Sequence, residues 1–288
     1  MNATAQASTT EAMNHNLDAA TVAGFGDEWT RFDSQGASKE ELDAIFEQYF
    51  SIFPWDALPP GAVGADVGAG SGRWAARVAP RAGLLHVIDA SRPALDVARQ
   101  NLANFPNCVF HEASVDAIPL EPSSLDFAYS LGVLHHVPDT MAALESCAKL
   151  LKRGAPFLVY LYYALDNRTQ GYQLAFKLSN FIRQRVSKLP NGMRYAVTQM
   201  LAASVYWPLA RAARIGEAAG LDVSGLPLAY YRNRSFYVMR NDALDRFGTP
   251  LERRFSRGEI ESMLKGVGFR DIAFRDAPPY WCAVGFRR

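Results

Sequence analysis

Three glycines at alternate positions, Gly68, Gly70 and Gly72, follow an apolar run in the segment "ADVGAGSGRW". Glycine loses more conformational entropy on ordering than any other residue, so this cluster indicates a backbone that turns sharply or is approached closely. The spacing is GxGxG, whereas loops that bind dinucleotides have GxGxxG. The loop therefore predicts a ligand site and disfavours a nicotinamide dinucleotide as its ligand.

Two acidic residues flank this loop and narrow the chemistry of the ligand. Asp66 precedes the first glycine by two positions, where its charge would repel a pyrophosphate but attract a cationic amine. Asp89 follows Gly68 by 21 positions, about the spacing at which an acidic side chain accepts hydrogen bonds from ribose hydroxyls. S-adenosylmethionine has a ribose, a cationic amine and no phosphate, so we expect it as the cofactor.

Two consecutive histidines, His135 and His136, are the candidates for acid–base chemistry. Methyl transfer from a sulfonium is an in-line displacement, to which a protein contributes chiefly by positioning the reactants in a dry pocket. A hydroxyl acceptor, or a carbon acceptor activated as an enol, also needs a base, and histidine titrates near neutrality. Either histidine could instead be structural, and Tyr230 and Tyr231 are then the next candidates.

Apolar runs of strand length alternate with helical patterns through the first half of the chain. Because the runs are continuously apolar, they predict a parallel sheet covered on both faces, a seven-stranded Rossmann-like α/β fold. After Tyr163 two long helical patterns interrupt the alternation, which resumes with a helix begun by Ser256 and Glu259 in capping-box spacing. The predicted divisions are a disordered leader (1–20), an α/β core (21–163), a helical lid (164–235) and the completion of the sheet (236–288).

With these elements in place, the chain resembles the class I S-adenosylmethionine-dependent methyltransferases, and is broadly similar to the ubiquinone-biosynthesis branch. The resemblance implies that the loop and Asp66 hold the methionine end, and that Asp89 and Ala90 hold the ribose. It places adenine beside "ASVDAIPL", where Ser114 and Val115 stand in for an acidic pair of the family. The implied cofactor residues are Asp66, Gly68, Ala69, Gly70, Gly72, Asp89, Ala90, Ser114, Val115, Asp116 and Leu131.

Two outer segments are expected to build the acceptor pocket. "GFGDEWTRF", with Phe25 and Trp29, resembles the leader helix that closes over the cofactor in this family, although it could merely pack on the sheet edge. In "YYRNRSFY", an extended segment would put Arg232 and Arg234 on one face, which suits a phosphate or carboxylate. The alternative is that these arginines pair with acids such as Asp242 and Asp245. The predicted acceptor residues are Phe25, Trp29, Tyr230, Tyr231, Arg232 and Arg234.

Charge is segregated into the predicted lid. Residues 166–214 hold eight lysines and arginines and one acid, whereas the whole chain has a net charge of +1. Together with the aromatic residues among them, these cations favour contact with an anionic, partly apolar substrate or with an anionic membrane surface. The remaining interpretation is an ordinary solvated face.

Composition excludes several other classes of protein. A net charge of +1 excludes a globally basic nucleic-acid binder. Three scattered cysteines predict neither a disulfide framework nor a metal site, and favour the cytoplasm. The first twenty residues lack the pattern of a secretory signal, and no apolar run is long enough to span a membrane.

The sequence thus predicts a methyltransferase that acts on a small molecule. A hydroxyl acceptor is favoured and a carbon acceptor is the alternative, on an anionic or partly apolar metabolite such as a nucleotide-linked sugar or a prenylated compound. The contrasting hypothesis is a non-catalytic S-adenosylmethionine-binding protein that docks on a protein or a membrane through its basic helices. Oligomeric state stays open.

Overall fold

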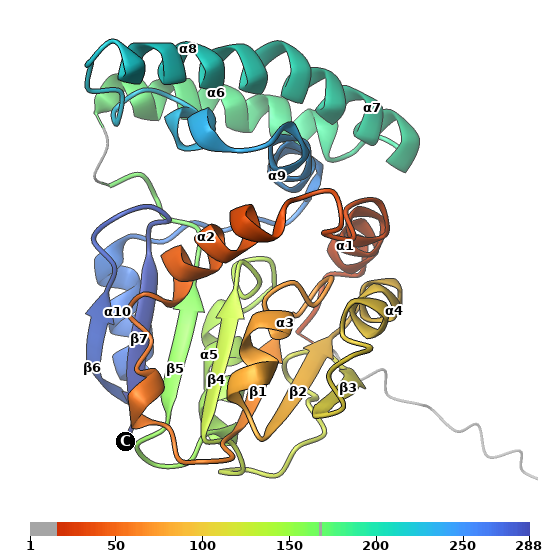
Figure 1. Cartoon of the computed structure of the whole chain (residues 1–288), viewed down its shortest axis with the longest axis vertical. Coiled ribbons are helices and arrows are strands. Elements are labelled where there is room, and N and C mark those ends of the chain that lie inside the picture. The colour runs from red at the N-terminus through yellow and green to blue at the C-terminus, as the bar shows by residue number, and fades with distance from the viewer. Residues whose placement is uncertain (1–15, 167–168) are drawn as a thin grey trace, which may run out of the picture.

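A single mixed sheet organises the chain (Figure 1), and the computed structural model describes residues 16–166 and 169–288. Its seven strands lie in the order β3-β2-β1-β4-β5-β7-β6, parallel except for β7, which is antiparallel to both of its neighbours. This arrangement confirms the predicted Rossmann-like fold. The strands are β1 Val63–Val67, β2 Leu84–Asp89, β3 Cys108–Glu112, β4 Phe127–Leu131, β5 Pro156–Tyr160, β6 Phe269–Phe274 and β7 Cys282–Arg287.

The central strands are continuously apolar because both faces of the sheet are covered. Along β4, Phe127 and Tyr129 point into one hydrophobic cluster and Ala128 points into the other, as the alternation of side chains in a strand requires. The first cluster is closed by α2 Lys39–Phe50, α3 Ala75–Val78 and α4 Arg92–Asn101, and the second by α5 Thr140–Leu150 and α10 Arg257–Gly266.

Local capping signals set where several of these helices begin. The Ser256 side chain accepts a hydrogen bond from the Glu259 amide, and the Glu259 carboxylate accepts one from the Ser256 amide, which confirms the predicted capping box. Ser91 and Asp139 cap α4 and α5 in the same way with their side-chain oxygens. The predicted leader lies outside the described residues as far as residue 15, and α1 Ala19–Arg31 begins at the end of that range.

A layer of helices covers the carboxyl ends of the parallel strands (Figure 1). It consists of α6 Gln170–Val186, α7 Asn191–Leu201, α8 Trp207–Ala218, the 3₁₀ turn Ala229–Asn233 and α9 Phe236–Gly248. A single π turn, Ala202–Tyr206, joins α7 directly to α8. None of the helices in the described part of the chain combines the length and apolarity needed to cross a membrane.

The helical layer extends further than the sequence predicts. Met239, Ala243 and Phe247 of α9 pack against Val186 of α6 and Ala202 in one hydrophobic cluster. Therefore α9 is part of the layer, although the sequence analysis assigned it to the completion of the sheet. Its amphipathic pattern fits either location, and only packing decides between them.

Candidate active site

The glycine loop between β1 and α3 has the backbone that its sequence predicts. Gly68, Gly70 and Gly72 have φ angles of +81°, +55° and +73°, a region that L side chains rarely adopt. A Cβ atom on Gly70 would lie 2.7 Å from the Trp29 ring, and one on Gly68 would overlap Val133. The loop is thus both turned and closely approached, and a larger side chain at any of the three positions would collide with its neighbours.

Asp89, at the end of β2, holds this loop in place. Its Oδ2 accepts a hydrogen bond of 2.8 Å from the Gly70 amide, and its Oδ1 accepts one of 2.8 Å from the Ser91 amide. Each carboxylate oxygen has a further lone pair, so both can also accept hydrogen bonds from the hydroxyls of a ribose. Burial raises the pKa of Asp89 above its ordinary value.

One cavity of about 1120 Å³ runs from this loop to the underside of the helical layer. Its wall includes most of the predicted cofactor residues, namely Gly68, Ala69, Asp89, Ala90, Ser114, Val115 and Leu131. It also includes all six predicted acceptor residues, namely Phe25, Trp29, Tyr230, Tyr231, Arg232 and Arg234. The fold therefore brings together residues that lie far apart in the sequence.

Four predicted cofactor residues do not line the cavity. Gly70 and Gly72 belong to the glycine loop but do not line the cavity, and neither does Asp116. Asp66 is buried, and its carboxyl accepts a hydrogen bond of 3.0 Å from the Tyr129 hydroxyl across β1 and β4. Because Asp66 points into the covered face of the sheet, burial raises its pKa to about 8. Its predicted contact with the methionine end is therefore replaced by a role inside the core.

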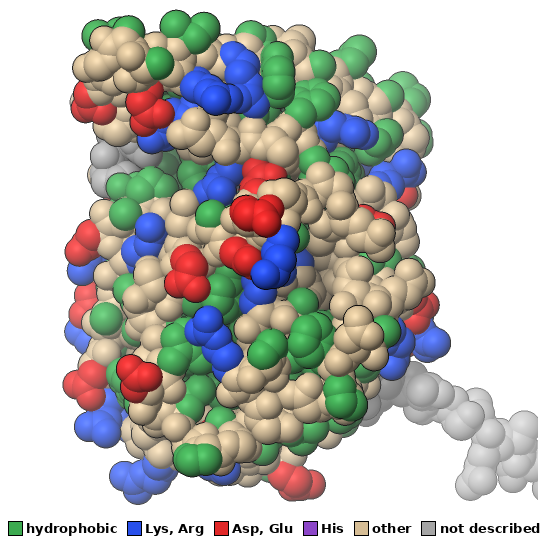
Figure 2. Space-filling model, viewed as in Figure 1, with side chains coloured by type: hydrophobic (Ala, Val, Ile, Leu, Met, Phe, Trp, Pro, Cys, Tyr) green, Lys and Arg blue, Asp and Glu red, His purple; other side chains and the backbone are tan. Residues whose placement is uncertain are grey.

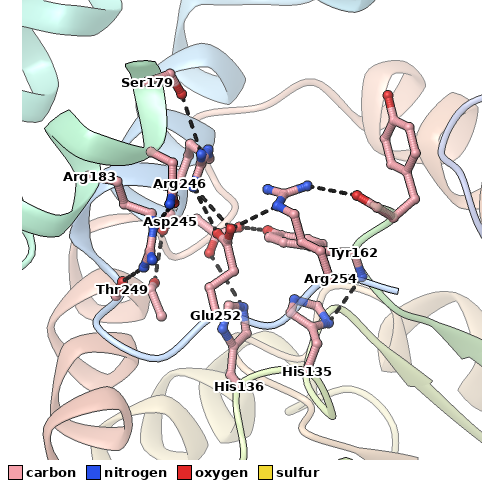
Figure 3. Close-up of polar contacts among 12 residues, drawn as sticks. His135, His136, Tyr162, Ser179, Arg183, Asp245, Arg246, Thr249, Glu252 and Arg254 are labelled. Carbon is pink, nitrogen blue, oxygen red and sulfur yellow. Dashed lines mark hydrogen bonds and ion pairs between the residues drawn. The ribbon is translucent and has the colours of Figure 1, made fainter. Parts of the chain in front are cut away.

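Only one of the two histidines lines the cavity. Nδ1 of His136 lies 2.7 Å from the carbonyl oxygen of Leu251 and donates to it, which leaves the lone pair on Nε2. Burial lowers the pKa of His136, partly offset by Asp245, so the ring is neutral near pH 7. His135 is fully buried, stacks on the Tyr162 ring at 3.9 Å and accepts a hydrogen bond from the Tyr162 amide (Figure 3). His135 is therefore a structural residue.

A carboxylate that the sequence analysis did not place in the site faces His136. Oδ1 of Asp245 in α9 lies 3.9 Å from Nε2 of His136, and the Tyr162 hydroxyl donates to Oδ2 of the same carboxylate (Figure 3). Asp242, one helical turn earlier, also lines the cavity, and burial raises its pKa to about 6. Two acids three residues apart share one face of a helix, and that spacing is the signal by which they could have been found.

The two arginines predicted to bind an anion are arranged differently. Their segment forms a 3₁₀ turn rather than an extended strand. Arg232 forms an ion pair of 2.8 Å with Glu217, and Arg234 donates a hydrogen bond of 2.9 Å to Gln48. Neither forms an ion pair with Asp242 or Asp245, the alternative partners, in the described part of the chain. The two guanidinium groups therefore do not form a joint anion-binding fork.

Helix α1 covers the cavity, as the resemblance implied. Phe25 contacts the edge of the His136 ring, with ring centroids 5.0 Å apart, and Trp29 lies against the glycine loop. Arg73, which follows the loop, places its guanidinium 4.9 Å from the Trp29 ring. These contacts hold α1 against His136 and the glycine loop.

Comparison with known proteins agrees with this geometry. Residues 65–159 match the model of a methyltransferase domain. The chain is 27% identical to a ubiquinone biosynthesis O-methyltransferase of Paracidovorax citrulli over 62% of this chain and 73% of that protein. It is 28% identical to the enzyme of the same name in Xanthomonas campestris over 79% of this chain and 91% of that protein. A phosphoethanolamine N-methyltransferase of Caenorhabditis elegans is 29% identical over 57% of this chain and 36% of that protein.

The glycine loop, the sheet order and the matched domain together define the class of protein. The chain is a class I S-adenosylmethionine-dependent methyltransferase, and S-adenosylmethionine is its cofactor. Gly68 and Asp89 fit this cofactor, because both line the cavity and each Asp89 oxygen can accept a further hydrogen bond from a ribose hydroxyl.

Proposed function

We propose that this enzyme transfers the methyl group to a hydroxyl of a small, partly apolar acceptor, with His136 as the general base. The observation that carries the proposal is the state of its ring. Nδ1 is fixed by Leu251, while Nε2 has no hydrogen-bond partner among the described residues and belongs to a side chain of the cavity wall. A neutral imidazole with a free lone pair is the group that accepts a proton near pH 7.

The proposed step is a displacement at carbon. The bound cofactor supplies an electrophilic methyl group on a positively charged sulfur. His136 takes the proton of the acceptor hydroxyl at Nε2 as the new C–O bond forms and the C–S bond breaks. Asp245 then stabilises the imidazolium across 3.9 Å, and the thioether product leaves without charge. A carbon acceptor activated as an enol would use the same base.

The part of the cavity that would hold the acceptor, here called the acceptor chamber, has a wall that favours a partly apolar acceptor over an anionic one. Aromatic rings contribute much of it, namely Phe25, Tyr49, Tyr160, Tyr162, Phe176, Tyr230 and Tyr231. Two of its arginines, Arg246 and Arg254, are already paired, because they share the Glu252 carboxylate at 3.0 and 2.9 Å. This favours a prenylated or aromatic metabolite over a nucleotide-linked sugar. The names of the two ubiquinone-biosynthesis relatives are in keeping with a hydroxyl acceptor.

We also propose that residues 164–248 act as the lid that selects the acceptor. The 3₁₀ turn and α9 supply several residues of the chamber wall, including Tyr231 and Asp245. The contrasting function, a binding protein without turnover, would not require a neutral base at His136 or a carboxylate that faces it.

The test is transfer of isotope-labelled methyl groups from S-adenosylmethionine into a metabolite extract, followed by mass spectrometry. The wild-type protein should label a compound that extracts into organic solvent. His136→Ala should lower the rate by about 10²- to 10⁴-fold while its affinity for S-adenosylhomocysteine stays unchanged. His111→Ala is the matched control. His111 of the edge strand β3 pairs with His86 of β2, and neither histidine lines the cavity. Full activity of His136→Ala, or tight cofactor binding by a wild-type protein that labels nothing, would overturn the proposal.

A further inference from the structure

Exposed apolar side chains are concentrated on the helical layer. Among the described residues, all but two of the large hydrophobic side chains that are exposed lie between Leu174 and Phe236. Leu174 and Leu178 in α6 are 70% and 65% exposed, and Ile215 in α8 is 71% exposed. Soluble surfaces rarely carry contiguous apolar patches of this kind unless they meet a partner.

These side chains share the outward face of each helix. In α6, Leu174, Leu178 and Phe181 follow the spacing i, i+4, i+7, whereas Arg183 and Val186 of the opposite face are buried. In the α7–α8 rod, Met193, Met200 and Trp207 recur every seven residues. The inward face of that rod is occupied by Ala202, Tyr206 and Ala210, which pack on α9. The apolar face is thus turned away from the sheet.

Positive charge lies among these apolar side chains. Lys177, Arg185, Lys188 and Arg214 are exposed, and the only acid from 170 to 218 is Glu217, which pairs with Arg232. Arg185 lies 4.6 Å from the Phe181 ring, and Arg211 lies 4.1 Å from the Trp207 ring. Figure 2 shows green and blue side chains over the upper end of the molecule, where these helices lie.

Two other basic residues of the segment are buried and hold the helices together, so they are distinct from the exposed cations. Arg183 donates to the Thr249 carbonyl at 2.8 Å, and Arg194 donates to the Gly248 carbonyl at 3.2 Å. Both are buried. They join α6 and α7 to the end of α9. Among the described residues the four exposed cations have no such carbonyl partner, and they remain on the solvent side.

We propose that this face of α6 and the α7–α8 rod docks on the surface of an anionic lipid membrane. Large apolar and aromatic side chains interleaved with lysine and arginine match the acyl boundary and the headgroups of such a surface. A second copy of the chain is the poorer occupant, because a two-fold contact would bring this positive face against itself.

The docking face is continuous with the cavity. Val205, Leu209 and Leu226 are exposed hydrophobic residues of the layer and also line the cavity wall. These three side chains thus join the docking face to the cavity wall and offer a route from the lipid to the cavity. That an apolar acceptor enters by this route rests on the proposed function, whereas the docking itself does not.

The test is sedimentation of the full-length protein with two kinds of vesicle, phosphatidylcholine alone and phosphatidylcholine mixed with phosphatidylglycerol. We expect at least tenfold tighter binding to the anionic vesicles and a loss of that binding as salt is raised. Leu178→Ser with Phe181→Ser, and separately Lys177→Glu with Lys188→Glu, should each weaken binding at least tenfold. Val109→Ser is the matched control, because Val109 is exposed on β3, outside the helical layer.

Affinity for S-adenosylhomocysteine should be the same in all these variants, which shows that they are folded. Equal binding to both vesicles, no binding to either, or unchanged binding by both double variants would overturn the docking proposal. A dimer that dissociates in the double variants without any vesicle binding would assign the face to a second copy instead. Methyl transfer that persists without vesicle binding would refute docking alone, and vesicle binding without methyl transfer would refute the proposed function alone.

Discussion

Nε2 of His136 and Oδ1 of Asp245 face each other across 3.9 Å at the wall of the cavity. Neither atom has a hydrogen-bond partner among the described residues. The separation is too long for a direct hydrogen bond. The pair therefore marks the place where we expect the acceptor to lose its proton.

The first prediction concerns the pH dependence of this base. Burial lowers the pKa of His136 and the Asp245 charge raises it, so Asp245→Asn should lower that pKa further. Because the base works when neutral, the rise of kcat/KM with pH should move to a lower pH, and kcat should fall because the imidazolium loses its stabilising charge. Rate profiles from pH 5 to 9 measure both effects.

Tyr162→Phe serves as the control for this experiment. It removes the hydroxyl that donates to Asp245 but keeps the carboxylate charge. The rise of kcat/KM should therefore occur at a higher pH in Tyr162→Phe than in Asp245→Asn. An Asp245→Asn profile that coincides with the wild-type profile would show that Asp245 does not act on the base.

The second prediction concerns cofactor affinity. Asp89→Ala removes a charged acceptor, which should weaken binding of S-adenosylhomocysteine by ~1.5 to 3 kcal/mol in calorimetry. Asp89→Asn keeps one acceptor oxygen, so its affinity should lie between that of Asp89→Ala and that of the wild type. Asp96→Ala, an exposed carboxylate on α4 that pairs with Arg92, is the control and should bind as the wild type does. Undiminished affinity of Asp89→Ala would assign the ribose contact to another residue.

The third prediction uses the buried carboxyl of Asp66. Its pKa is about 8 in the folded state and about 3.9 in the unfolded chain, so the folded state holds the proton more tightly. The free energy of unfolding should therefore fall as pH rises from about 4 to about 8. Asp66→Asn cannot ionise, and at pH 8 it should be more stable than the wild type by an amount on the order of a few kcal/mol.

Urea unfolding at pH 5 and pH 8 measures this difference, with Asp96→Asn as the exposed control. The wild type and Asp66→Asn should converge toward pH 5 and separate at pH 8. Parallel pH dependences of the two proteins would mean that Asp66 is ionised in the folded state.

Short-range patterns were enough to define the fold and the cofactor. A continuously apolar strand, a GxGxG turn and a capping box each depend on residues within a few positions, and each is found where the sequence predicts it. The spacing from Gly68 to Asp89 also held, because one crossover between adjacent parallel strands fixes how far apart the ends of β1 and β2 can lie.

The acceptor side of the site was decided by tertiary structure. His136, Tyr162 and Asp245 come from the loops that follow β4 and β5 and from α9, and no local pattern relates them. Arg232 illustrates the same limit: its segment was compatible with an extended strand, but Glu217 on α8 and the packing of Tyr231 stabilise a 3₁₀ turn. Local sequence selects among a few backbone shapes by fractions of a kcal/mol, whereas burial of a side chain against a distant helix contributes about 1.5 to 3 kcal/mol. For residues that are distant in the sequence but in contact in the fold, burial therefore outweighs local backbone preference.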